Sequence, residues 1–249
     1  MSEPARSRPE RFRADLVAGV ALDGIVVRTP SHQVIEVLVA DPGHGLDVVM
    51  LDREHSSFDA GTLDTCLAVA GALGVATLVR IGQLDRSAVQ QALDLGATGV
   101  VVPHVVTAAD ARRAVSLAHY GDGGRGFSGS TRSAGWGTRP MADVIDRAAS
   151  TTTVVVQVED PAALDEVDEI VATPGVDAVF VGAADLAVAM GARSVTDRRV
   201  EEACSTVVAA CRAAEVAVAA FAGDAEAAAA WRERGATLVF RGTDQVRLR

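Results

Sequence analysis

Short apolar runs rich in Val and Ile alternate along the chain with Ala- and Leu-rich segments of helical period. Near-continuous apolar runs are typical of parallel strands buried on both faces, and amphipathic segments between them are typical of helices. The predicted strands are 24–29, 46–52, 76–81, 98–103, 152–158, 177–182, 215–220 and 236–241. The predicted helices are 31–41, 59–73, 84–95, 107–119, 139–149, 161–171, 197–213 and 223–233.

Eight strands alternating with helices over about 250 residues favour an α/β fold of the (β/α)8 TIM-barrel type. A doubly wound open sheet is the structural alternative. No GxGxxG motif follows the first predicted strand, which argues against a bound NAD. The polar, Arg-rich segment 1–13 is predicted to be a flexible N-terminal tail, and one barrel domain is predicted to cover residues 14–249.

The charge and the residue types exclude several classes of function. The net charge is −10 and no long basic cluster is present, so nucleic acid is not an expected partner. No uncharged apolar stretch is long enough for a membrane span, no secretory signal is recognisable, and the three cysteines lack a zinc-site spacing, which together predict a cytoplasmic protein. All 23 basic residues are Arg, which excludes Schiff-base catalysis by lysine and the usual lysine linkage to PLP. Carbanion chemistry would therefore need another electron sink, such as a metal ion.

Ionisable side chains gather where the predicted strands end. In a TIM barrel the active site is built at the C-terminal ends of the strands. The side chains at these positions are Asp52, Glu54, His55, Arg80, His104, Gln157, Glu159, Asp160, Asp185 and Arg241. Each alone has an ordinary explanation as a helix cap or a salt bridge. Together they suggest a site, because burying like charges is costly unless a cation or counter-charge lies among them.

Glu159 and Asp185 are the best candidates for a pair of metal ligands. Carboxylate oxygens without cysteine or clustered histidine point to Mg²⁺ or Mn²⁺. Two carboxylates leave coordination positions open for a chelating 2-oxo acid, and the metal would then act as a Lewis acid. A long Gly- and Ser-rich loop within 120–150 carries Arg125 and Arg132 and is predicted to be either a ligand-binding loop or a mobile surface loop.

At these residues the chain resembles the HpcH/HpaI aldolase family, the metal-dependent class II pyruvate aldolases such as 4-hydroxy-2-oxoheptanedioate aldolase. The resemblance covers residues 17 to 245. Its motifs are LDREH (51–55), LVRIG (78–82), ALDLGATGVVVPHV (92–105), GGRGFS (123–128), VVVQVED (154–160) and GVDAVFVGAADLAVAMG (175–191). The resemblance implies a barrel of the phosphoenolpyruvate/pyruvate type that assembles into a homo-oligomer, a trimer or a hexamer. It also implies a carbon–carbon lyase that reversibly cleaves a 4-hydroxy-2-oxo acid to pyruvate and an aldehyde through a metal-bound pyruvate enolate.

The resemblance further implies a role for individual residues. Glu159 and Asp185 would bind Mg²⁺ or Mn²⁺, with Co²⁺ as a third option. Arg80 would contact the keto oxygen, and His55 would be the acid/base group with Asp94 as its partner. The other implied site residues are Gln157, Gly182, Ala183 and Ala184 at the substrate, Asp52 and Glu54 behind His55 or metal-bound water, and Arg125, Arg132 and Trp136 on the aldehyde side.

The sequence departs from the family pattern at Ala183, where the family usually has proline in Gly-Pro-Ala-Asp. This puts the carboxylate-binding turn, and with it the substrate choice, in doubt. Three other functions stay open: a citrate lyase β or malyl-CoA-type lyase, an oxaloacetate decarboxylase, and a non-catalytic barrel that binds a 2-oxo acid. The lack of lysine argues against the CoA-dependent lyase, and the intact set of site residues argues against the non-catalytic barrel.

Overall fold

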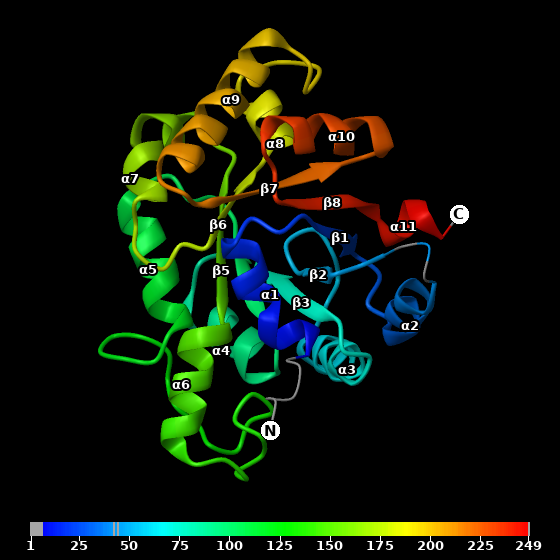
Figure 1. Ribbon diagram of the computed structural model, residues 1–249, viewed down its shortest axis with the longest axis vertical. Coiled ribbons are helices and arrows are strands. Elements are labelled where there is room, and N and C mark those ends of the chain that lie inside the picture. Colours follow the sequence, from blue (N-terminus) through cyan, green and yellow to red (C-terminus); the bar gives the residue numbers. More distant parts are fainter. Residues whose placement is uncertain (1–6, 42, 44, 249) are drawn as a thin grey trace.

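A computed structural model describes residues 7–41, 43 and 45–248, and its strands close into a parallel barrel (Figure 1). Each strand pairs in parallel with the next, and the last pairs with the first. The strands are β1 (Leu22–Val27), β2 (Val48–Asp52), β3 (Ala76–Arg80), β4 (Gly99–Val102), β5 (Thr153–Val158), β6 (Ala178–Val181), β7 (Ala217–Ala222) and β8 (Leu238–Thr243). The structure therefore confirms the predicted TIM barrel, with strand bounds within about two residues of the prediction.

Successive side chains of each strand point to opposite faces, which produces two hydrophobic layers. In β2, Val48 and Met50 belong to the apolar cluster that fills the barrel, whereas Val49 and Leu51 pack outward with the helices. Phe180 and Phe240 lie in the inner cluster, with ring centroids 5.8 Å apart. Because both faces are covered, both faces of the strands must be apolar, which is the pattern in the sequence.

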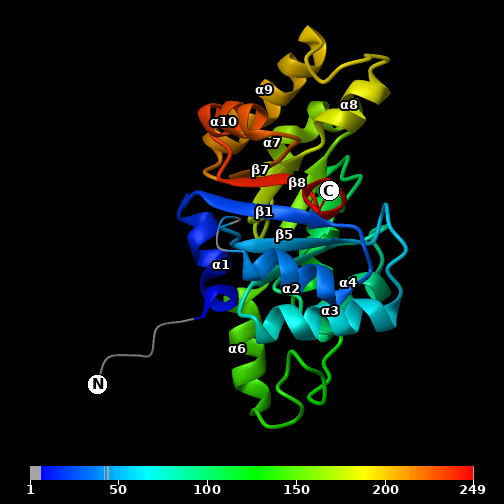
Figure 2. The ribbon, with the colours of Figure 1, turned by 90° about the vertical axis from the view of Figure 1, so that its right-hand side faces the viewer.

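Helices follow most strands and surround the barrel (Figures 1 and 2). They are α2 (His32–Ala40), α3 (Ala60–Ala72), α4 (Arg86–Asp94), α5 (Ala108–Ala118), α6 (Met141–Thr151), η2 (Pro161–Glu166), α7 (Val167–Val171), α9 (Arg198–Ala213) and α10 (Ala225–Arg234). Asp59 and Thr107 cap α3 and α5 by accepting backbone hydrogen bonds from Thr62 and Asp110. The predicted helix 161–171 is divided into a 3-10 turn and a short α-helix.

The prediction of a flexible tail over 1–13 is wrong for residues 8–13. These residues belong to α1 (Arg8–Val17), whose Phe12 and Leu16 are buried in the inner apolar cluster. The two side chains are four residues apart and so share one face of the helix, which lies against the N-terminal end of the barrel. Residues 1–6 lie outside the described part of the chain.

Two short helices were not predicted. They are α8 (Ala183–Ala189), directly after β6, and α11 (Asp244–Arg247), directly after β8. In Figure 1, α8, α9 and α10 lie at the upper end of the molecule, and α6 with the loop before it lies at the lower end. Among the described residues, no helix is both long and apolar enough to cross a membrane.

Candidate active site

A pocket of about 790 Å³ lies at the C-terminal ends of the strands. It brings together several of the side chains that the sequence predicted for the site. These lining residues are His55, Arg80, Gln157, Gly182, Ala183, Ala184 and Asp185. Parallel strands end at the same edge, so residues far apart in sequence meet there.

Asp52 and Arg80, which lines this pocket, form a buried charge pair. Asp52 is 0% exposed, and its carboxylate accepts hydrogen bonds from Arg80 Nε at 3.0 Å and Nη2 at 2.7 Å. Arg28 Nε donates a third bond at 2.9 Å. Burial raises the pKa of Asp52, but the hydrogen bonds and charge of Arg80 more than offset it and lower the pKa below 3.8. Asp52 is therefore an anion that fixes the direction of the Arg80 guanidinium.

Asp52 also shapes the turn that carries the next two site residues. Its Oδ1 accepts hydrogen bonds from the backbone N–H groups of Glu54 and His55 at 3.1 and 3.2 Å. Asp52 thus holds the backbone at His55, although it does not bond the imidazole among the described contacts. The His55 side chain is half exposed, and its Nε2 lies 3.5 Å from Glu54 Oε2.

Glu54 and Glu159 bring two buried carboxylates to the mouth of the barrel. Glu54 Oε2 lies 3.3 Å from Arg80 Nε, and Glu159 Oε1 accepts a hydrogen bond from the backbone N–H of His104 at 2.8 Å. Gln157 Nε2 donates to Glu159 Oε2. Burial is the main cause that raises the pKa of Glu159; the hydrogen bonds from His104 and Gln157 oppose it, and the Glu54 charge raises it further.

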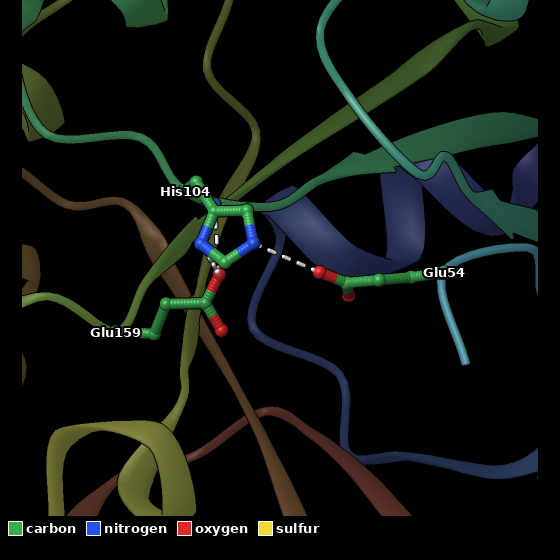
Figure 3. Close-up of side chains that lie close together, drawn as sticks. All are labelled: Glu54, His104 and Glu159. Carbon is green, nitrogen blue, oxygen red and sulfur yellow. Dashed lines mark hydrogen bonds and ion pairs between the residues drawn. The ribbon is translucent and has the colours of Figure 1, made fainter. Parts of the chain in front are cut away.

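His104 lies between these two carboxylates, as Figure 3 shows. Its Nδ1 is 3.0 Å from Glu159 Oε1, and its Nε2 is 3.0 Å from Glu54 Oε1. One ligand atom from each of Glu54, His104 and Glu159 lies within 4.8 Å of the others. Two buried oxygens nearby, Glu54 Oε2 and Gln157 Oε1, accept no hydrogen bond within the part of the chain that the structure describes. Paired buried acids fit a divalent cation, because a cation would offset their mutual repulsion.

The two predicted metal ligands differ in burial and in their neighbours. Glu159 belongs to the three-residue group, whereas Asp185 is exposed in the first turn of α8 and is not in the group found among the described residues. Asp185 nevertheless lines the same pocket. The turn before it packs directly on Glu159, because a Cβ on Gly182 would lie 2.4 Å from Glu159 Cβ. Glycine is therefore required at this point of the β6–α8 connection.

Within one chain, Asp94 pairs with Arg125 and not with His55, the partner predicted for it. Asp94 is the last residue of α4, and its carboxylate accepts hydrogen bonds from Arg125 Nη2 at 2.5 Å and Nε at 3.2 Å. No hydrogen bond joins Asp94 to His55 among those of the described residues. The physical reason is that α4 carries the chain back toward the N-terminal ends of the strands, away from the mouth where His55 lies.

The expected aldehyde-side residues Arg125 and Arg132 also lie elsewhere. They line a separate pocket of about 270 Å³ that includes Thr98 and Thr152, the residues just before β4 and β5. Arg132 bonds the Leu95 carbonyl at 2.6 Å, and its guanidinium lies over the Trp136 ring. The Gly-rich loop follows α5 and therefore begins at the N-terminal end of the barrel. Within one chain these arginines thus belong to the opposite end from the mouth.

Two residues of the mouth were not assigned a role from the sequence. His104 was noted only as the residue that follows the fourth strand, yet it contacts both glutamates. Arg28 follows β1, lines the mouth pocket and bonds Asp52. The signal for both was their position directly after an apolar run, which is the same signal that identified Arg80 and Glu159.

The fold and the mouth define a class: a TIM barrel with an arginine and acidic side chains converging at the C-terminal ends of its strands. The chain belongs to the HpcH/HpaI aldolase/citrate lyase family, whose sequence profile matches residues 30–249.

Relatives and solved structures agree with this assignment. The chain is 36% identical over 208 residues to a hydroxypyruvate/pyruvate aldolase of Paraburkholderia phytofirmans, covering 80% of this chain and 79% of the relative. It is 35% identical over 184 residues to a 5-keto-4-deoxy-D-glucarate aldolase of Salmonella paratyphi A, covering 74% and 70%. The crystal structure of an HpcH/HpaI aldolase/citrate lyase family protein from Burkholderia cenocepacia superposes with a TM-score of 0.90 at 34% identity, covering 96% of this chain and 95% of that one.

Proposed function

We propose that this protein is a divalent-metal-dependent aldolase that reversibly cleaves a 4-hydroxy-2-oxo acid to pyruvate and an aldehyde. The family assignment and the two aldolase relatives support a carbon–carbon lyase. The observation that carries the proposal is the arrangement at the mouth: the Arg80 guanidinium, fixed by Asp52 and beside Glu54, lines a pocket large enough for a small oxo acid. The pocket is also lined by Asp185, so it combines a fixed positive charge with one of the two proposed metal ligands.

Arg80 stabilises negative charge on the substrate in this proposal. Its guanidinium is aimed before substrate arrives, so no reorganisation is needed when charge develops on the keto oxygen. A divalent ion bound at Glu159 would add a Lewis acid to the same oxygen. Asp185 is the second proposed metal ligand, while Gln157 and the turn Gly182–Ala183–Ala184 form the proposed wall against which the 2-oxo acid lies.

His55 is the proposed acid/base group. Its side chain is half exposed and lines the pocket, so it can meet a substrate hydroxyl. In the cleavage direction it would accept the proton of the C4 hydroxyl as the C3–C4 bond breaks, and a proton then goes to C3 to give the methyl group of pyruvate. Glu54, whose Oε2 faces His55 Nε2, takes within one chain the orienting role that the family resemblance implied for Asp94. The family resemblance also leads us to propose a trimer or hexamer, which light scattering of the purified protein would test.

The reaction class can be tested directly with purified protein. Incubation with pyruvate, Mg²⁺ or Mn²⁺ and a panel of aldehydes should yield new 4-hydroxy-2-oxo acids, detected by mass spectrometry. EDTA and Glu159→Ala should each abolish the products. Glu169→Ala, which removes an exposed acid on α7, is the matched control and should leave them unchanged. Products that survive both EDTA and Glu159→Ala would contradict the metal-dependent mechanism, and a metal-loaded protein that binds pyruvate without forming any product would support the non-catalytic barrel.

A further inference from the structure

The mouth pocket extends well beyond the residues of the proposed reaction. Its volume of about 790 Å³ lies within the range of about 300–1,000 Å³ that is typical for drug-sized ligands, whereas pyruvate is only a three-carbon acid. One part of the pocket contains Arg80 and Asp185, which the proposed reaction uses. The other part, which we call the apolar lobe, is lined by Val195, Cys204, Phe221, Ala227, Ala230 and Trp231.

The apolar lobe lies where α9 and α10 face each other, side by side at the upper end of the molecule (Figures 1 and 2). Ala227, Ala230 and Trp231 are three and four residues apart, so they share one face of α10. Two alanines leave space on this face, and the Trp231 side chain, which is 8% exposed, gives it a large apolar wall. Cys204 lines the lobe from α9, and burial raises the pKa of its thiol, which therefore stays uncharged.

The polar groups around the lobe are paired within the chain. Glu201 Oε1 lies 3.2 Å from Arg234 Nη2, and the Arg234 guanidinium lies 5.5 Å from the centroid of the Trp231 ring. The Thr196 hydroxyl lies 2.7 Å from that of Ser194. A ligand that brought a carboxylate or several hydroxyls into the lobe would lose water without gaining an unpaired partner, which is costly. The lobe therefore suits an uncharged apolar group.

Two exposed apolar side chains lie in the same pocket. Ala217 and Ala219 of β7 belong to the inner apolar cluster, so Phe221, two residues further, points toward the mouth. Phe221 is 42% exposed, and Val195 in the loop before α9 is 49% exposed. Exposed apolar surface in a groove is typical of a binding site, because a ligand that covers it removes that surface from water.

We infer that the apolar lobe binds the R group of the aldehyde, and that this protein acts on aldehydes with an extended, uncharged alkyl or aryl chain. The inference rests on the proposed function and names its second substrate. In the synthesis direction the methyl carbon of pyruvate loses a proton and bonds to the aldehyde carbon, while the aldehyde oxygen gains a proton. The R group takes no part in these bond changes. Because one continuous pocket contains both the reaction centre and the lobe, the R group can extend from the reacting carbon into the lobe.

Steady-state kinetics with pyruvate, Mn²⁺ and the straight-chain aldehydes from acetaldehyde to hexanal test the inference. Each methylene that enters the lobe should raise kcat/KM about three- to fourfold, because burying a methylene group is favourable by about 0.8 kcal/mol. Succinic semialdehyde, which carries a carboxylate, and glyceraldehyde, which carries hydroxyls, should both have a lower kcat/KM than hexanal.

Ala230→Phe fills the lobe, and Ala229→Phe is the matched control. Both alanines are exposed neighbours on α10, but only Ala230 of the two lines the pocket. Ala230→Phe should raise the KM for hexanal at least about tenfold and change that for acetaldehyde less than about twofold, since only the longer chain reaches the lobe. Ala229→Phe should match the wild type with both aldehydes. Circular dichroism would show that both variants are folded.

Binding of hexan-1-ol separates the lobe from the reaction, because this alcohol has the chain of hexanal without its carbonyl. Saturation-transfer NMR should detect hexan-1-ol on the wild type and on Ala229→Phe, and Ala230→Phe should lose the signal. This result would support the lobe even if the protein formed no 4-hydroxy-2-oxo acid from any aldehyde, which would contradict only the proposed function.

Three results would overturn the inference. A higher kcat/KM for succinic semialdehyde than for hexanal would place the R group beside a cation such as Arg28, which also lines the pocket. Equal changes in the KM values of hexanal and acetaldehyde in Ala230→Phe would show that the lobe does not distinguish chain length. A hexan-1-ol signal that is absent from the wild type, or that Ala230→Phe leaves unchanged, would show that the lobe does not bind the chain.

Discussion

Two buried carboxylates at opposite ends of the barrel differ in the partners that surround them. Asp177, just before β6, accepts hydrogen bonds from Arg13 Nε at 2.9 Å and from the Val154 N–H at 2.8 Å. Glu159, just after β5, has a histidine and a second carboxylate beside it. Burial is the main cause that raises the pKa of both groups. Asp177 has its permanent cation within the chain, whereas Glu159 is crowded by the like charge of Glu54, so we interpret the first as architectural and the second as a site for an external cation.

The largest expected effect separates the two acids by activity. Glu159→Gln should lower kcat/KM for the aldol reaction at least about a thousandfold, because a bound metal ion supplies several kcal/mol of charge stabilisation. Asp177→Asn, measured under the same conditions on folded protein, should keep kcat/KM within about threefold of the wild type. Equal losses of kcat/KM in the two variants would contradict the different roles assigned to Glu159 and Asp177.

Arg80→Met tests the internal cation of the mouth. Arg80 bonds Asp52 and lies beside Glu54, so its removal leaves two buried acids with less compensation. Breaking a buried pair in this way should lower the free energy of unfolding by about 3–5 kcal/mol, measured by urea denaturation. Asp52→Asn in the same background should restore part of the loss, since it removes one of the stranded charges. A variant with the free energy of unfolding of the wild type would show that Asp52 and Glu54 do not need Arg80 for stability.

Asp177→Ala tests the acid at the N-terminal end through stability. It leaves the buried Val154 N–H and the Arg13 guanidinium without their acceptor. The expected loss in the free energy of unfolding is about 1–3 kcal/mol. Glu169→Ala on the surface of α7 should change it by less than about 0.5 kcal/mol. An unchanged stability of Asp177→Ala would mean that water replaces the acceptor.

The contrast between the two ends also explains what the sequence could predict. The β-branched runs identified all eight strands, because strands buried on both faces must be apolar throughout. Strand-end residues such as Arg80 and Gln157 were assigned to the pocket for the same reason, since parallel strands end at one edge. Asp94 and Arg125 were implied by the family resemblance and do not stand at strand ends: Asp94 ends α4 and Arg125 follows α5, and these helices return the chain to the other end of the barrel.

Two other features depended on contacts that no local pattern encodes. The segment that forms the start of α1 is polar and Arg-rich, and its Phe12 becomes informative only once Leu16, one turn later, is seen to share its face. The contribution of His104 depends on a left-handed turn that directs its ring at two acids from other strands. Its sequence motif, Pro103–His104, gave its position but not its direction.

The smallest expected effect is a dependence of stability on pH. Burial raises the pKa of Asp177 above 3.8, so the folded protein holds a proton there more tightly than the unfolded chain does. The contribution of this group is therefore fully present below 3.8 and is lost as the pH rises through the raised pKa. The stability of the wild type relative to Asp177→Asn, from urea unfolding at a series of pH values, should decline across that window. A difference that grows with pH would mean that Arg13 lowers the pKa instead.

The most direct test of a metal-dependent site at the mouth is a crystal structure of the protein soaked with Mn²⁺ and pyruvate. Anomalous scattering locates the ion independently of the carboxylates around it. The account predicts an Mn²⁺ peak bound by Glu159, with pyruvate in the mouth pocket and its keto oxygen facing Arg80. An ion located away from Glu159, or pyruvate bound outside this pocket, would contradict it.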